Sequence, residues 1–416
     1  MSYSGWMGTL QFIRDNLKFL SAGFLLTFAS CFGQTFFISI FAGEIMAEFD
    51  LTHGRWGAIY MVGTLASAAV MVWAGALTDR FRVRRLGGIV LGGMVVACAF
   101  MSINNSVWLL PLAVFALRLM GQGMLSHLAA VSMARWYVAA RGRALAIASF
   151  GYLVGEALLP LIFVSALGFI GWRWSWGISA MAALALLPIM LMLLKAERTP
   201  QAVAEENQAV GLGGKHWTRN EVLRHWLFWL LVPLLIGPST FGTAFFFHQV
   251  HLAEVKGWTH LQMVSLFPVY TVTSTIISII AGFAIDRFGA GRVLPVLLIP
   301  VAIGFFIFSA TATMLGAVIG VVLFGVSSGM NATAPSAFWA EYFGTRNLGS
   351  IKAMATAVMV LGSAIGPGLT GWVIDSGVNY SDQMAWVSVY FLIAAGLTFV
   401  GIWRAERSLA TNKISS

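Results

Sequence analysis

Two ionisable side chains stand in the middle of long apolar segments, where charge is costly and by default functional. Arg118 lies within the apolar segment 106–134, and Glu156 lies within 143–166. A guanidinium is permanently charged and can grip a carboxylate through two parallel hydrogen bonds. A carboxyl group whose charge is opposed by burial and favoured by a nearby cation can take up and release a proton. These residue types predict anion binding at Arg118 and proton coupling at Glu156.

The same two residues could also neutralise each other. Since an unpaired charge inside a membrane is expensive, we expect Arg118 and Glu156 to lie close together, and a buried pair of this kind could simply hold helices in register. The sequence leaves both roles of Arg118 open, and they do not exclude each other. Gln122 is four residues from Arg118 and therefore shares its helix face, which Ser126 continues.

Other polar side chains within apolar segments either line a cavity or join helices by hydrogen bonds. Gln34 is near the centre of the first segment, and Ser327, Ser328 and Asn331 lie in the tenth. At segment ends, Glu44 could carry protons, and His248 with Gln249 and His251 could form an outer gate or proton entry, although interfacial histidines are usually only solvated. His127 is on the face opposite Arg118, which favours a packing role. The predicted site residues are Arg118, Gln122, Gln34, Asn331 and Ser327 for substrate binding, Glu156 and Glu44 for proton coupling, and His248 for gating.

The elements that position these residues must lie in lipid. Of the 416 residues, 59% are apolar and 10% are charged, whereas a soluble globular chain carries roughly 25% charged residues. Cys31 and Cys98 both lie in apolar segments, which excludes a disulfide framework and a thiolate metal site. The sequence has no Walker-type glycine loop, no metal-spaced His/Cys cluster and no nucleophile elbow. We therefore expect a protein that is not an enzyme and has no cofactor and no metal.

Twelve apolar segments are long enough to be membrane-spanning helices, which need roughly 20 apolar residues each. Their boundaries are good to about 4 residues. A polar stretch from Lys195 to Arg224 separates the sixth from the seventh. The predicted spans are 19–46, 57–77, 86–104, 106–134, 143–166, 174–194, 227–252, 262–284, 293–312, 315–338, 350–373 and 384–403.

The distribution of positive charge predicts the orientation of these spans. With the amino terminus inside, 21 of the 25 Lys and Arg residues fall on the cytoplasmic side, three fall outside, and only Arg118 stays within the membrane. The sequence thus predicts a multi-pass protein of the inner membrane with both termini in the cytoplasm. The net charge of +9 is then a topology signal and does not indicate nucleic acid. No small-residue cleavage site follows the charged start, so we expect no cleaved signal.

The two halves of the chain repeat each other. The segment 75–85 (GALTDRFRVRR) matches 282–292 (GFAIDRFGAGR), and 155–160 (GEALLP) matches 362–367 (GSAIGP), both at an offset of 207 residues. The segment 32–37 (FGQTFF) matches 241–246 (FGTAFF) at an offset of 209. Parallel six-helix repeats with a charged linker are typical of transporters. We predict bundles at 1–194 and 226–416, joined by a cytoplasmic linker at 195–225.

The repeated loop resembles the signature of the major facilitator superfamily, G-x-x-x-D-R-x-G-x-(R/K)-(R/K). The first copy has Arg82 where the family usually has Gly, and the second copy keeps Gly289. The resemblance covers essentially the whole chain. It implies an all-α fold of twelve helices in two pseudo-symmetric bundles, with spans 1, 4, 7 and 10 lining the cavity. It also implies a gating role, in the loops after spans 2 and 8, for Asp79, Arg80, Asp286 and Arg287.

A second resemblance concerns the entry into the fifth span. Its R-G-x-A-x-x-x-A-x-x-G pattern, from Arg141 to Gly151, is similar to that of the monocarboxylate and oxalate–formate transporters. Drug–proton antiporters have a proline where Glu156 stands. Residues 262–284 carry no charge, unlike the eighth span of eukaryotic monocarboxylate carriers, so an anion contact falls to Arg118.

These resemblances imply secondary active transport by alternating access, with symport of protons and a small organic anion. The alternative is efflux of an amphipathic or drug-like compound by proton antiport. A membrane sensor built on a transporter fold is a third possibility, which predicts a large output domain. We expect the partners to be a small-molecule substrate, protons and the lipid bilayer, with no nucleic acid, and we expect a monomer.

Overall fold

The computed structural model describes residues 5–75, 77–137, 141–195, 211–344 and 347–414. Within these ranges the side chains of Asp79, Asp286 and residues 5–10, 134–135, 141–142, 349–350 and 408–414 are left out of the description. Every regular element in the described residues is a helix. Eleven of the described helices are long and apolar enough to cross a membrane. The all-α membrane fold predicted from hydropathy is confirmed.

The chain divides into two compact units. Unit 1 comprises Met1–Leu51 and Ala58–Glu205, and unit 2 comprises Thr52–Gly57 and Glu206–Ser416. The first residues of the helix that begins at His53 thus belong with unit 2. We retain the bundle bounds 1–194 and 226–416 as a proposal.

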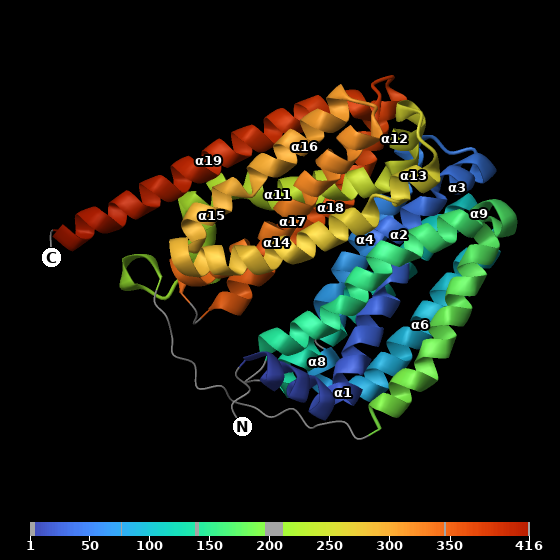
Figure 1. Ribbon diagram of the computed structural model, residues 1–416, viewed down its shortest axis with the longest axis horizontal. Coiled ribbons are helices and arrows are strands. Elements are labelled where there is room, and N and C mark those ends of the chain that lie inside the picture. Colours follow the sequence, from blue (N-terminus) through green and yellow to red (C-terminus); the bar gives the residue numbers. More distant parts are fainter. Residues whose placement is uncertain (1–4, 76, 138–140, 196–210, 345–346, 415–416) are drawn as a thin grey trace. The chain divides into compact units, whose positions relative to one another are not determined.

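Unit 1 is formed by helices that pack along one another over most of their length (Figure 1). Two of its expected spans are interrupted, as described below for the site. Its elements are α1 (Gly5–Ser30), η1 (Cys31–Gly33), α2 (Thr35–Ile38), η2 (Ser39–Phe41), α3 (Ala42–Phe49), α4 (His53–Ala74), α5 (Leu77–Arg80), α6 (Val83–Ile103), η3 (Val107–Leu109), α7 (Leu110–Arg118), η4 (Leu119–Leu125), α8 (Ser126–Trp136) and α9 (Arg141–Leu193).

The helix α9 contains two membrane spans. Its 53 residues would extend about 80 Å as a straight helix, against a hydrocarbon core of about 30 Å. Gly171 interrupts it with φ 71° and ψ 165°, a conformation that glycine adopts without steric cost. Figure 1 accordingly shows α9 as two arms joined by a bend. With α9 counted twice, the eleven described helices agree with the twelve predicted spans.

Small residues allow α1 and α9 to approach closely. A Cβ atom at Gly151 would collide with the Phe24 carbonyl oxygen. Beside this contact, the Thr27 hydroxyl donates a hydrogen bond to the Ala148 carbonyl, 2.5 Å away. Close backbone approach with hydroxyl hydrogen bonds is how helices associate in lipid, where burial of apolar surface gives no net gain.

Unit 2 has a core of buried apolar side chains, many of them aromatic. Within it α14 packs along α17, and α16 packs along α19. Its elements are η6 (Leu212–Gly214), α10 (Arg219–Arg224), α11 (Trp226–Phe247), α12 (Gln249–Lys256), α13 (His260–Val264), α14 (Phe267–Phe288), α15 (Ala290–Val296), α16 (Leu298–Ala310), α17 (Met314–Phe343), α18 (Leu348–Asp375) and α19 (Tyr380–Ile414).

Candidate functional site

The first span is broken in its apolar middle, and this differs from the continuous helix expected over 19–46. After Ser30 the chain tightens into a 3₁₀ turn, and Gln34 is extended, with φ −87° and ψ 154°. A Cβ atom at Gly33 would collide with the Leu117 carbonyl oxygen. The backbone of the fourth span therefore approaches the break directly. Broken helices are tolerated at membrane depth only where protein or a cavity satisfies the freed backbone groups.

Arg118 supplies that partner. Its Nη1 donates to the Gly33 carbonyl oxygen at 3.3 Å and to the Thr35 hydroxyl at 3.2 Å. Its guanidinium carbon lies 5.3 Å from the centre of the Tyr60 ring, a cation–π distance. The residue is only 2% exposed, yet its Nε has no hydrogen-bond partner among the described residues. A buried cation is thus anchored to the break and keeps an unused donor.

The expected ion pair between Arg118 and Glu156 is replaced by separate contacts. The contacts of Arg118 go to Gly33, Thr35 and Tyr60. Glu156 is 5% exposed and accepts a hydrogen bond from the Tyr152 hydroxyl at 3.0 Å. The freed carbonyl and the aromatic face thus serve the guanidinium in place of a carboxylate.

The fourth span contains a π-helical segment, η4 (Leu119–Leu125), directly after Arg118. A Cβ atom at Gly121 would lie 2.6 Å from the Gly33 Cα, so the segment approaches the break closely. The α-helical spacing that placed Gln122 and Ser126 on the face of Arg118 does not hold here: Gln122 is exposed, whereas Arg118 is buried. π-Helical turns are rare in proteins, and those that do occur are frequently found at functional sites.

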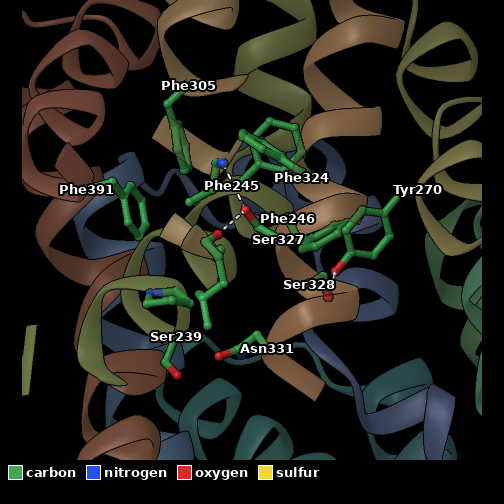
Figure 2. A pocket seen from close by; sticks show the side chains of 14 residues that line it. Ser239, Phe245, Phe246, Tyr270, Phe305, Phe324, Ser327, Ser328, Asn331 and Phe391 are labelled. Atoms are coloured by element: carbon green, nitrogen blue, oxygen red, sulfur yellow. Dashed lines mark hydrogen bonds between the residues drawn. The ribbon is translucent and has the colours of Figure 1, made fainter. Parts of the chain in front are cut away.

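Unit 2 contains a pocket of its own, with a cavity volume of about 140 Å³. Figure 2 shows its aromatic side chains surrounding the cavity. Helices α11, α16 and α17 contribute most of its lining residues, and α14 and α19 contribute one each. The lining residues are Pro238, Ser239, Gly242, Phe245, Phe246, Tyr270, Leu297, Val301, Phe305, Phe324, Ser327, Ser328, Asn331 and Phe391.

Ser327 lines this pocket, and its hydroxyl also replaces one backbone hydrogen bond of a neighbouring helix. It accepts a hydrogen bond from the Val301 amide at 2.9 Å and donates one to the Leu297 carbonyl at 2.5 Å. In a regular helix these two backbone groups would bond each other, so the hydroxyl is inserted into the ladder next to Pro300. The hydroxyl proton of Ser327 is therefore already engaged.

Two other predicted residues lie in polar surroundings near these sites. Gln34 is 8% exposed and forms the break of the first span itself. Asn331 lines the pocket, and its amide makes no hydrogen bond to the described part of the chain. The Ser328 hydroxyl accepts from the Tyr270 hydroxyl at 2.8 Å, which keeps its own proton for another acceptor.

A family model described as Major Facilitator Superfamily matches residues 23–282 and 250–413. The chain belongs to the major facilitator superfamily. It is therefore a multi-pass membrane protein of a transporter family.

Individual relatives are more distant. An uncharacterised protein of Mycobacterium tuberculosis is 25% identical over 353 residues, which cover 81% of this chain and 82% of that protein. The membrane sensor protein UhpC of Salmonella typhimurium is 25% identical over 249 residues, 56% of this chain and 53% of that protein.

Two solved structures share the fold. A bacterial homologue of the human lysosomal transporter Spinster has a TM-score of 0.70 and 16% identity, covering 93% of this chain and 96% of its own. The nucleoside transporter NupG has a TM-score of 0.69 and 14% identity, covering 94% and 98%. At these identities the likeness shows the fold alone.

The superfamily signature loops are only partly described. The side chains of Asp79 and Asp286 lie outside the described residues, and those of Arg80 and Arg287 are exposed.

The sequence analysis did not single out Glu341 as a site residue. Its Oε2 accepts a hydrogen bond from the Ala290 amide at 2.9 Å, at the start of α15. A carboxylate at a helix amino terminus is favoured by the helix dipole. An acid at the end of the tenth apolar segment was the signal that could have identified it.

His248 follows directly after α11 and is buried. Its Nε2 lies 2.9 Å from the Pro367 carbonyl oxygen, so it donates a proton there. Its ring centre is 6.0 Å from that of His53, which in turn is 4.5 Å from that of His251. Burial lowers the pKa of His248 to about 3 and that of His251 to about 4. Both imidazoles are therefore neutral at physiological pH.

Glu44 lies in the first turn of α3 and is half-buried. The nearby Glu48, which the sequence did not single out, pairs with Arg173 at 2.5 Å and accepts from the Trp172 indole at 2.8 Å. The hydrogen bond from Arg173 holds the pKa of Glu48 below its usual range. This pair joins α3 to the bend region of α9.

Proposed function

We propose that the protein is a proton-coupled secondary transporter of a small organic anion, with Arg118 as the group that binds the anion. The observation that carries the proposal is a fully buried guanidinium with a donor left unused. Thr35, which already contacts Arg118, adds a hydroxyl beside it. A carboxylate is the ligand that a planar, permanently charged fork binds best. The membership of a transporter family supports movement of the anion across the membrane.

Glu156 is the proposed proton carrier. Burial opposes its charge, whereas the hydrogen bond from Tyr152 favours it. An anion arriving at Arg118 adds a second negative charge to the unit that holds Glu156. Like charges disfavour one another, so anion binding favours protonation of Glu156. This coupling gives symport, in which proton and anion bind and leave together.

The gating residues follow from the resemblance of two loops to the superfamily signature. We propose that these loops take part in the conformational change through Asp79, Arg80, Asp286 and Arg287. We also propose that His248 acts as a gate at the opposite end of its bundle. Glu44 remains a candidate for proton entry. We also propose an inner-membrane location with both termini in the cytoplasm and a monomeric protein.

Efflux of an amphipathic compound is the second candidate, because the pocket of unit 2 is lined by aromatic side chains and, among the described residues, by no charged one. The similarity to the membrane sensor protein UhpC supports a sensor role as the third candidate function. Only organic-anion transport gives the unused Nε donor of Arg118 a ligand to bind.

The test is transport by the purified protein in liposomes. An inward proton gradient should drive accumulation of radiolabelled small carboxylates, and the same compounds should raise the melting temperature of the protein by mass action. Amphipathic cations that are expelled in exchange for protons, with no carboxylate bound, would support antiport in its place. Binding of carboxylates without any flux would support a sensor.

A further inference from the structure

The pocket of unit 2 has the lining of a site for an aromatic ring. Five phenylalanines and Tyr270 form its walls, and no charged side chain lies among its described lining residues. The Phe245 and Phe324 rings meet edge to face at 4.8 Å, and Phe246 meets Tyr270 in the same way at 5.4 Å. Such arrangements present both ring faces and ring edges, which is how aromatic groups prefer to pack.

The size of the cavity matches a single ring. Its volume is about 140 Å³, and an engineered cavity of about 150 Å³ lined by Leu, Ile and Phe side chains binds benzene. Gly242 makes part of the space, since a Cβ atom there would meet no atom within 4 Å.

The polar groups gather on one side. Figure 2 shows Ser239 and Asn331 below the cavity, away from the rings of Phe305 and Phe324. The Ser327 hydroxyl donates to the Leu297 carbonyl and the Ser239 hydroxyl to the Leu235 carbonyl. Ser328 and Asn331 are therefore the groups that remain for a ligand. They offer uncharged donors and acceptors, which suit the substituent of a ring and give no reason for a charge to enter.

We propose that this pocket binds one six-membered aromatic ring that carries an uncharged hydrogen-bonding substituent. The proposal rests on unit 2 alone and is independent of the anion site proposed at Arg118.

The experiment uses benzamide and, as a ring-free amide, acetamide as probes, with affinity measured on the full-length purified protein by calorimetry. Wild type should bind benzamide at least about tenfold more tightly than acetamide, since only benzamide buries a ring. Gly242→Leu should fill the cavity and remove the advantage of benzamide. The matched control is Gly396→Leu, at an exposed position of α19 that also has open space around its Cβ but does not line the pocket. It should bind like wild type.

Gly242→Ala adds a single methyl group and keeps the test open if the leucine variant does not fold; it should weaken benzamide binding several-fold. Unchanged benzamide binding by a folded Gly242 variant would overturn the ring site. Equal affinity of wild type for benzamide and acetamide would also overturn it, while leaving the proposed anion site untouched, because neither probe carries a charge.

Discussion

Arg118→Lys separates the two roles of this residue. The guanidinium ties the broken first span to the fourth through Gly33 and Thr35, and it presents an Nε donor that no described residue uses. Lysine keeps the positive charge at a position 2% exposed. It loses the planar arrangement of donors that allows two parallel hydrogen bonds to one carboxylate.

The expected effects differ in size for binding and for stability. Loss of one hydrogen bond between charged partners costs about 1.5–3 kcal/mol, which corresponds to a roughly tenfold to hundredfold weaker carboxylate affinity. The Gly33 carbonyl keeps a positively charged donor only if the shorter ammonium reaches it. If it does not, a buried acceptor without a partner costs about 1–3 kcal/mol of stability.

Carboxylate affinity by calorimetry and the melting temperature of the unliganded protein measure these two effects. The control is Arg173→Lys, because Arg173 also donates to backbone carbonyls, those of Ser102 and Asn104, and pairs with Glu48. It should lower the melting temperature and leave carboxylate affinity unchanged. The reasoning is refuted if Arg118→Lys binds carboxylates with wild-type affinity; Arg118 then only stabilises the helix break, and the efflux candidate gains support.

Three further changes and one titration test the remaining assignments. Glu156→Gln should abolish proton-driven accumulation in liposomes yet spare exchange of labelled for unlabelled solute, because only net transport requires proton release. Asp79→Asn should slow transport while calorimetry finds nearly unchanged affinity, since the proposed role is in the conformational cycle; a parallel loss of both would contradict it. Ser327→Ala leaves two backbone groups without their bridging hydroxyl and should cost about 1–3 kcal/mol of stability, with carboxylate affinity retained. Because the pKa of His248 is lowered to about 3, the unfolded chain binds more protons below about pH 6.5. The free energy of unfolding should therefore fall on acidification from pH 6.5 towards 3, by on the order of 2 kcal/mol between pH 7 and 5. The melting temperature of His248→Gln should depend less on pH in that range. The other titratable groups near His248 are His53, His251, Asp375, Glu254 and Tyr380.

The spans could be predicted because lipid leaves the backbone few options. Without water, every peptide group must be satisfied internally, so long apolar segments become helices. The same argument fails at the level of single turns. The segment around Gly33 and Gln34 is as apolar as its neighbours, and its break depends on contact with Leu117 and Gly121 from another span. No local pattern in the sequence contains that contact.

The expected pairing of Arg118 with Glu156 failed for a related reason. The argument from cost is sound: a buried charge needs compensation. It does not follow that the compensation is an opposite charge. A carbonyl freed by a broken helix and the face of Tyr60 are also strong partners for a guanidinium. The sequence could identify the buried cation but not the backbone group that holds it.

The internal repeat shows where chemistry departs from fold. The segment 32–37 (FGQTFF) contains the break that Arg118 stabilises, whereas its match 241–246 (FGTAFF) continues as the regular helix α11. In the first copy the glycine lies against a neighbouring backbone; in the second, Gly242 faces open space in the aromatic pocket. Gly325 stands 207 residues after Arg118, so the second half has no cation at the repeated position. The likeness between the copies therefore predicts the common helices, and their differences indicate a separate feature in each unit, a buried cation in unit 1 and an aromatic pocket in unit 2.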